Sequence, residues 1–176
     1  MIVALLLAAA SSEQTAVDAE RAFAARAQQV GQWTAFREYA APSFPLGRPL
    51  LEAMADLNRR IHQEFTYDPH FTTVATPLNQ VLTEQRGVCQ DFAHLAMACL
   101  RAWGLAARYV SGYLETLPPP GQPRLIGADA SHAWLAVYVP GVGWAEFDPT
   151  NDCMPGEKHI TLAWGRAYWS WSIAIF

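Results

Sequence analysis

The stretch RGVCQDFAHL, residues 86–95, places a tight glycine turn directly before an amphipathic helix. Apolar residues continue at helical spacing as far as Trp103, and Gly104 stands where such a helix would end. We therefore predict a helix that begins at Cys89 and ends near Trp103. On its first turn, unpaired N–H groups and the helix dipole favour the thiolate form of cysteine. Because the thiolate is the reactive form, Cys89 is a candidate nucleophile.

A cationic partner is expected for this thiolate, since the carboxylate of Asp91 in the same turn opposes a second negative charge. His132 is the candidate. It lies in residues 131–139, where side chains alternate as they do in a strand with two different faces. A turn signal, Pro140-Gly141, separates this strand from a second one over residues 143–148.

The two predicted strands form a hairpin in which a loop centred on Pro140 sets His132 opposite Asp148. Cross-strand neighbours on one face have Cβ atoms about 4.5–5.5 Å apart, so the carboxylate can accept the imidazole N–H. In this register Trp134 faces Glu146 and becomes a candidate wall of an acyl pocket. A slip of one residue would send Asp148 to the other face.

Nucleophile, base and orienting carboxylate are thus predicted as Cys89, His132 and Asp148. Each residue also has a structural interpretation. A cysteine on an apolar helix face is usually a packing residue, and Asp148 is suited to cap the turn formed by residues 149–151. We expect structural roles for His94, for His159 and for a buried Cys99, and we assign no role to Cys153.

Four motifs together resemble the core of the bacterial transglutaminase-like superfamily. They are GVCQDFA at 87–93, RYVSGY at 108–113, SHAW at 131–134 and FDPTN at 147–151. The resemblance runs from about residue 39 to residue 166. It implies an α+β fold with a papain-like transglutaminase core, in which the nucleophile helix packs on an antiparallel sheet. It also implies that Cys89, His132 and Asp148 are the catalytic triad, with Gln90 and Trp134 as candidate substrate-pocket residues.

The resemblance is weaker at both ends of the chain. We divide it into residues 1–41, an apolar and helical segment, and residues 42–176, the catalytic core. Within the core, short helices are also predicted near 50–64 and 77–85. After Arg166 the family pattern continues with an acidic residue and a further strand, whereas this sequence reads AYWSW at 167–171. The sheet is therefore expected to be incomplete at its C-terminal end.

Composition narrows the possible partners. A chain of 176 residues with a formal charge of −4 has no basic stripe for phosphates, so nucleic acid is not expected as a partner, and a protein or peptide substrate is. The three cysteines lack the paired spacing of a zinc site and are expected to be free thiols. We expect no metal and no cofactor. The oligomeric state stays open.

The first ten residues are continuously apolar but too few to span a bilayer, which takes about 20 residues. No Lys or Arg precedes them, as a secretory signal would require. A cytoplasmic location is therefore favoured, and export through an atypical signal over residues 1–10 is the alternative.

The expected reaction is thiol-dependent acyl transfer or hydrolysis on a peptide or glutamine carboxamide, through a thioester intermediate. The sequence does not distinguish between three outcomes of the thioester: peptide hydrolysis, glutamine deamidation and crosslinking. The resemblance favours a peptidase or amidase. A catalytically silent peptide-binding module and an arylamine-type acyltransferase are the alternatives.

Overall fold

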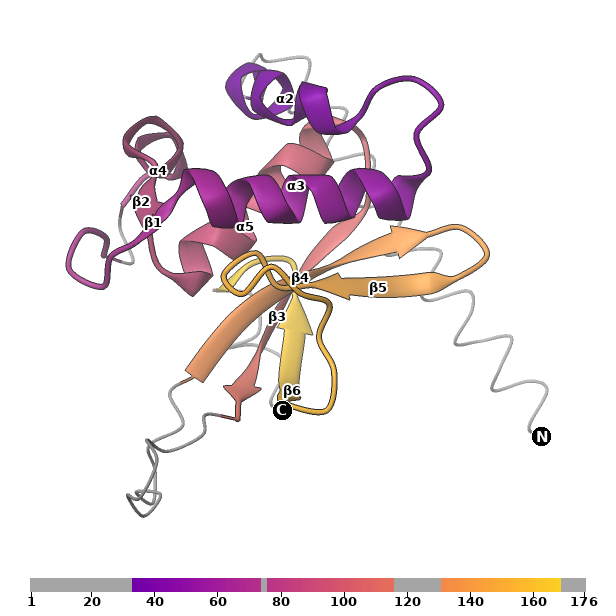
Figure 1. The fold of residues 1–176 in the computed structure, drawn as a ribbon. Coiled ribbons are helices and arrows are strands. Elements are labelled where there is room, and N and C mark those ends of the chain that lie inside the picture. The colour runs from indigo at the N-terminus through magenta and orange to yellow at the C-terminus, as the bar shows by residue number, and fades with distance from the viewer. Residues whose placement is uncertain (1–32, 74–75, 116–130, 169–176) are drawn as a thin grey trace, which may run out of the picture.

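The computed structural model describes residues 33–73, 76–115 and 131–168 of the chain. Its helices gather on one face of a four-stranded antiparallel sheet, as Figure 1 shows. In chain order the elements are α2 (Thr34–Ala40), the 3-10 helix η1 (Ala41–Ser43), α3 (Leu50–Glu64), β1 (Thr66–Tyr67), α4 (Leu78–Glu84), β2 (Arg86–Gly87), α5 (Cys89–Ala102), β3 (Ala107–Leu114), β4 (Ser131–Val139), β5 (Gly143–Phe147) and β6 (His159–Gly165). The predicted α+β class and the helices near 50–64 and 77–85 are confirmed.

Helix α5 forms the centre of the core. It packs on strands β3 and β4 with one side and on helices α2, α3 and α4 with the other. Most of its side chains are buried, because the apolar residues of its sequence cover more than one face; Phe92, Leu95 and Leu100 are examples. Gly104, with φ +77°, follows the helix and takes the left-handed conformation that ends it, as predicted.

Helix α2 also belongs to the core, since its Phe36 and Ala40 are buried against it. The rest of the predicted N-terminal segment lies outside the described residues, so the boundary at residue 41 stays a prediction. The apolar stretch 1–10 and the sequence at 169–176 lie outside them as well. In the described part of the chain, no helix has the length and apolar character needed to cross a membrane.

The sheet has the strand order β5-β4-β3-β6. The hairpin of β4 and β5 is observed, but our register is wrong by two positions: Glu146 pairs with Ala136 rather than Trp134. The reason is the loop, which closes at the pair Val139 and Gly143 and therefore contains three residues. A shift of two residues keeps every side chain on its predicted face. The contacts predicted as directly opposite are consequently diagonal.

Gly112 allows three strands to meet closely. It lies in β3 between His132 of β4 and Thr161 of β6, next to an irregularity in the β3–β6 pairing. A Cβ atom at this position would be 2.1 Å from the carbonyl oxygen of Ile160 and 2.6 Å from the Trp134 ring. Glycine is thus required for β6 to approach the rest of the sheet.

The sheet face away from α5 carries a cation–π stack. The guanidinium of Arg108 on β3 lies 4.3 Å from the ring centroid of Trp144 on β5 and 4.4 Å from that of Trp164 on β6. Both rings attract the positive charge, so the stack connects the two outer strands through one side chain of β3.

Candidate active site

The first turn of α5 holds Cys89 next to the β1–β2 ladder. The Asp91 carboxylate caps this turn, because its Oδ2 accepts the Val88 N–H at 2.9 Å and the Thr72 hydroxyl at 2.6 Å. Gly87 makes room for the cap, since a Cβ atom there would be 2.9 Å from Asp91. Cys89 itself is half-buried. The first N–H groups of a helix have no carbonyl partner within the helix, and Cys89 is the first residue of α5.

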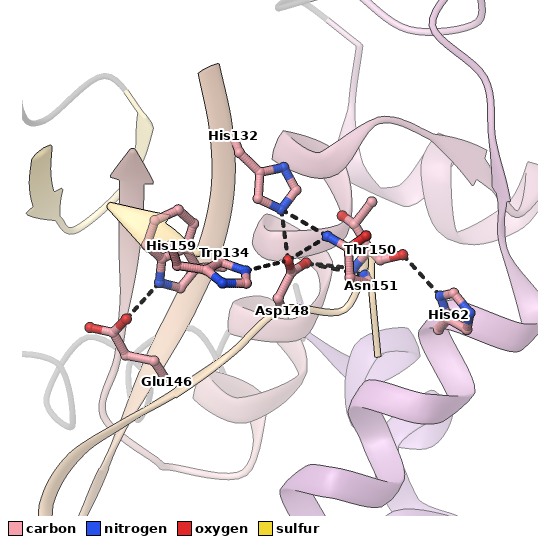
Figure 2. A network of polar contacts seen from close by, with 8 residues as sticks. All are labelled: His62, His132, Trp134, Glu146, Asp148, Thr150, Asn151 and His159. Carbon is pink, nitrogen blue, oxygen red and sulfur yellow. Dashed lines mark hydrogen bonds and ion pairs between the residues drawn. The ribbon is translucent and has the colours of Figure 1, made fainter. Parts of the chain in front are cut away.

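His132 and Asp148 meet across the hairpin, as Figure 2 shows. Nε2 of His132 lies 2.7 Å from Oδ2 of Asp148, whose side chain is fully buried. Burial alone would raise the pKa of Asp148, but hydrogen bonds and charge from His132, Asn151 and His159 lower it to about 2. Asp148 is therefore ionised at neutral pH and can only accept hydrogen bonds.

The same contact sets the orientation of the imidazole. Since Asp148 accepts, Nε2 of His132 carries the proton that is donated to it, and Nδ1 is left for another partner. Cys89 lies near enough to the imidazole to contribute to its pKa. Burial alone would lower the pKa of His132, but hydrogen bonds with Asp148 and Cys89 and the charges of both raise it to about 9. The structure thus brings the three predicted residues, Cys89, His132 and Asp148, to one place.

Asp148 is held from the turn that follows β5. Its Oδ1 accepts the backbone N–H groups of Thr150 at 2.9 Å and Asn151 at 3.3 Å. The turn-capping role that the sequence offered as an alternative is therefore present together with the contact to His132. Asn151 also donates its side-chain Nδ2–H to Oδ2 at 2.7 Å. Nδ2 of Asn151 lies 3.3 Å from Nε2 of His132, but both atoms are donors, so this approach is not a hydrogen bond.

His159 is a site residue that the sequence interpretation missed. Its Nε2 lies 3.0 Å from Oδ2 of Asp148, and its side chain is 7% exposed. It stands at the start of β6, a strand that joins the sheet beside β3. Alternating apolar and polar residues over 159–165 indicate a strand. The local sequence does not indicate that this strand brings His159 to the β4–β5 hairpin.

The position of Trp134 differs from the predicted one in the wall of a substrate pocket. The ring is fully buried, so it offers no surface to a substrate. Its Nε1–H donates to Oε2 of Glu146 at 2.7 Å, and its edge meets the His159 ring at a centroid distance of 5.2 Å. The His132 ring lies 6.0 Å away on the same strand. The buried Trp134 ring therefore packs against the rings of both His132 and His159.

A cavity of about 270 Å³ runs along another side of α5. Gln90, the other predicted pocket residue, lines it together with Asp91 and His94. Nε2 of His94 accepts the Tyr168 N–H at 3.2 Å, and burial is the main cause that lowers its pKa to about 4. A neutral, hydrogen-bonded His94 fits the structural role that we predicted.

The three cysteines are free thiols, as expected. Cys99 is fully buried, which raises its pKa to about 12. Burial and the charges of Asp148 and Asp152 raise the pKa of Cys153.

Three side chains of the site have the chemistry of metal ligands. One atom each from His132, Asp148 and His159 lies within 4.8 Å of the others, and imidazole with carboxylate suits a divalent transition metal. The separations of 2.7 and 3.0 Å are those of ordinary hydrogen bonds, which account for the arrangement without an ion. The expectation of no metal stays a prediction.

Comparisons with known proteins agree on one family. A model of the transglutaminase-like superfamily matches residues 39–149. An uncharacterised protein of Mycobacterium tuberculosis is 54% identical over 138 residues, which cover 76% of this chain and 44% of that protein. A protein-glutamine gamma-glutamyltransferase of Pseudomonas aeruginosa is 31% identical over 128 residues, which cover 62% of this chain and 19% of that enzyme.

A crystal structure from Cytophaga hutchinsonii, provisionally described as a cysteine protease, superposes with a TM-score of 0.63 at 28% identity. The match covers 77% of this chain and 43% of that one. The chain thus spans less than half of the length of these relatives.

Proposed function

The chain belongs to the transglutaminase-like superfamily, and on that basis we propose that it catalyses thiol-dependent acyl transfer through Cys89. The observation that carries the proposal is the His132 imidazole, which donates to a buried carboxylate and whose pKa is raised by Asp148 and by the candidate nucleophile Cys89. This is the arrangement of nucleophile, base and orienting group that acyl transfer requires.

In the first half of the reaction, the Cys89 sulfur attacks the carbonyl carbon of a peptide or glutamine carboxamide. The Cys89 proton resides on His132 before this attack, so the sulfur attacks as a thiolate paired with the imidazolium. The carbonyl oxygen becomes negative, and the backbone N–H of Cys89 at the start of α5 stabilises it. The C–N bond then breaks. His132, which a pKa of about 9 keeps protonated at neutral pH, gives a proton to the departing ammonia or amine. A thioester on Cys89 remains.

In the second half, a nucleophile attacks the thioester while His132 takes its proton, and the Cys89 sulfur leaves. Water yields hydrolysis or deamidation, and a second amine yields crosslinking. Asp148 keeps Nε2 of His132 protonated throughout, so that Nδ1 exchanges the proton with sulfur and substrate. We favour hydrolysis, on a peptide or carboxamide substrate, because the relative from Cytophaga hutchinsonii is described as a cysteine protease. The name of the Pseudomonas aeruginosa relative supports glutamine as the acyl donor.

Selective alkylation tests whether Cys89 is the nucleophile. We expect iodoacetamide at pH 7 to modify Cys89 at least about tenfold faster than Cys99 and Cys153, whose thiols are held neutral by raised pKa values. Peptide mass mapping over time measures the three rates. Similar rates at Cys89 and Cys153 would contradict the proposal and favour the catalytically silent peptide-binding module.

Thioester trapping then identifies the reaction. A glutamine-containing peptide is added, the mixture is quenched in acid, and the acyl adduct is located by mass spectrometry, with Cys89→Ala as the control that cannot form it. Ammonia release without amine incorporation indicates deamidation, a new peptide amino terminus indicates peptide hydrolysis, and incorporation of a dansylated amine indicates crosslinking. A reactive Cys89 that forms no adduct with peptides but accepts small aryl esters would favour the arylamine-type acyltransferase.

A further inference from the structure

We propose that His159 is a positioning residue of this site: it fixes the Asp148 carboxylate, so that four groups rather than three determine the reactivity of Cys89. The proposal rests on the proposed function. It concerns a residue of β6, which lies outside the four motifs that define the family resemblance.

The carboxylate of Asp148 receives more donors than the reaction itself needs. Oδ2 is approached by His132 at 2.7 Å, by Asn151 at 2.7 Å and by His159 at 3.0 Å, as Figure 2 shows. A carboxylate oxygen has two lone pairs, so three donors saturate it. An ionised carboxylate can only accept, and His159 therefore donates through its Nε2–H and keeps Nδ1 unprotonated when neutral.

His159 differs from Asn151 in how firmly it is held. Asn151 is exposed, so water competes for its amide. The His159 side chain is 7% exposed, and its ring meets the edge of the buried Trp134. Its backbone is fixed as well, because His159 pairs with Leu114 at the start of β6. A buried donor on a strand holds its acceptor more rigidly than an exposed one on a turn.

The two oxygens of Asp148 are therefore fixed from different elements. Backbone N–H groups of the turn after β5 hold Oδ1, and β6 holds Oδ2 through His159. Without His159, Oδ2 keeps only the exposed Asn151 amide beside His132, so the carboxylate plane is held less firmly and the bond to His132 has a less fixed direction. A less well directed carboxylate stabilises the His132 imidazolium less, and the reactivity of Cys89 then falls.

Two substitutions separate positioning from packing. His159→Leu keeps an apolar side chain beside Trp134 but removes the donor, whereas His159→Gln places an amide N–H near the position of Nε2. We expect His159→Leu to lower the rate of Cys89 alkylation by iodoacetamide at pH 7 by about tenfold, and to shift its pH profile, because a hydrogen bond to a charged group is lost. We expect His159→Gln to recover most of the rate. The exposed His70, changed to Leu, is the matched control and should react like the wild type.

The outcomes are distinct. Equal rates and pH profiles for the wild type and His159→Leu would overturn the inference, and so would an equal loss in His159→Leu and His159→Gln when circular dichroism shows both to be folded. If His159→Leu does not fold, His159→Asn, whose amide is too short to reach Oδ2, replaces it in the comparison with His159→Gln. A wild-type Cys89 that reacts no faster than Cys153 would instead contradict the proposed function.

Discussion

Replacing Gly112 by alanine probes how closely the sheet is assembled around the site. The added Cβ atom would lie 2.1 Å from the carbonyl oxygen of Ile160 and 2.6 Å from the ring of Trp134. Ordinary contacts of a Cβ atom begin near 3.4 Å, so β6 would have to move away from β3 by about 1.3 Å. Because the obstructing atom belongs to the backbone, no change of rotamer relieves the contact.

Overpacking of this kind typically costs about 1–3 kcal/mol. We expect Gly112→Ala to lie at the upper end, near 3 kcal/mol, since a strand rather than a side chain has to shift. The displacement moves His159, which is next to Ile160 in β6, away from Asp148. The rate of Cys89 alkylation should therefore fall as well as the free energy of unfolding.

Urea denaturation followed by fluorescence measures the free energy of unfolding. Gly156→Ala is the matched control, because its Cβ atom would meet nothing within 4 Å, and it should change the stability by less than about 0.5 kcal/mol. If Gly112→Ala proves as stable as Gly156→Ala, the close approach of β6 to β3 is wrong, and the placement of His159 is wrong with it.

Two further substitutions test the electrostatics of the site. The raised pKa of His132, about 9 against an ordinary 6.5, stabilises the folded state fully below pH 6.5, and this stabilisation is lost as the pH rises to 9. We expect the free energy of unfolding to fall across that window by about 2–3 kcal/mol in the wild type but little in Asp148→Asn, as urea denaturation at several pH values would measure; parallel curves would contradict the His132–Asp148 interaction. Asp91→Ala removes the acceptor of the Val88 N–H and should cost about 1–2 kcal/mol in the same assay at pH 7. An unchanged stability would mean that the cap contributes nothing.

The helix and the hairpin were predictable because their patterns are local. Helical spacing after Cys89 and alternation around His132 depend on neighbours within one element, and both were found. The register of the hairpin was not predictable in the same way. The loop after Val139 contains three residues, and the alternation of side chains does not determine the length of a loop. The error was harmless: the side chain of His132 still reaches Asp148, now diagonally.

The residues that the sequence did not reveal depend on non-local pairing. His159 reaches Asp148 only because β6 joins the sheet beside β3, and that neighbour is set by tertiary packing. The burial of Trp134 depends on the same strand, because its ring packs against the His159 ring of β6 at a centroid distance of 5.2 Å. Strands β4 and β5 bring His132 and Asp148 together, as predicted. Strand β6 adds His159, which the local pattern did not indicate.

The stack of Trp144, Arg108 and Trp164 provides a built-in optical reporter for the strand that carries His159. The emission of an indole changes when a guanidinium no longer lies over it, and Trp164 leaves Arg108 if β6 separates from β3. Arg108→Gln removes the charge from both indoles and identifies their share of the signal. Time-resolved fluorescence can thus follow detachment of β6 separately from global unfolding, without an external dye.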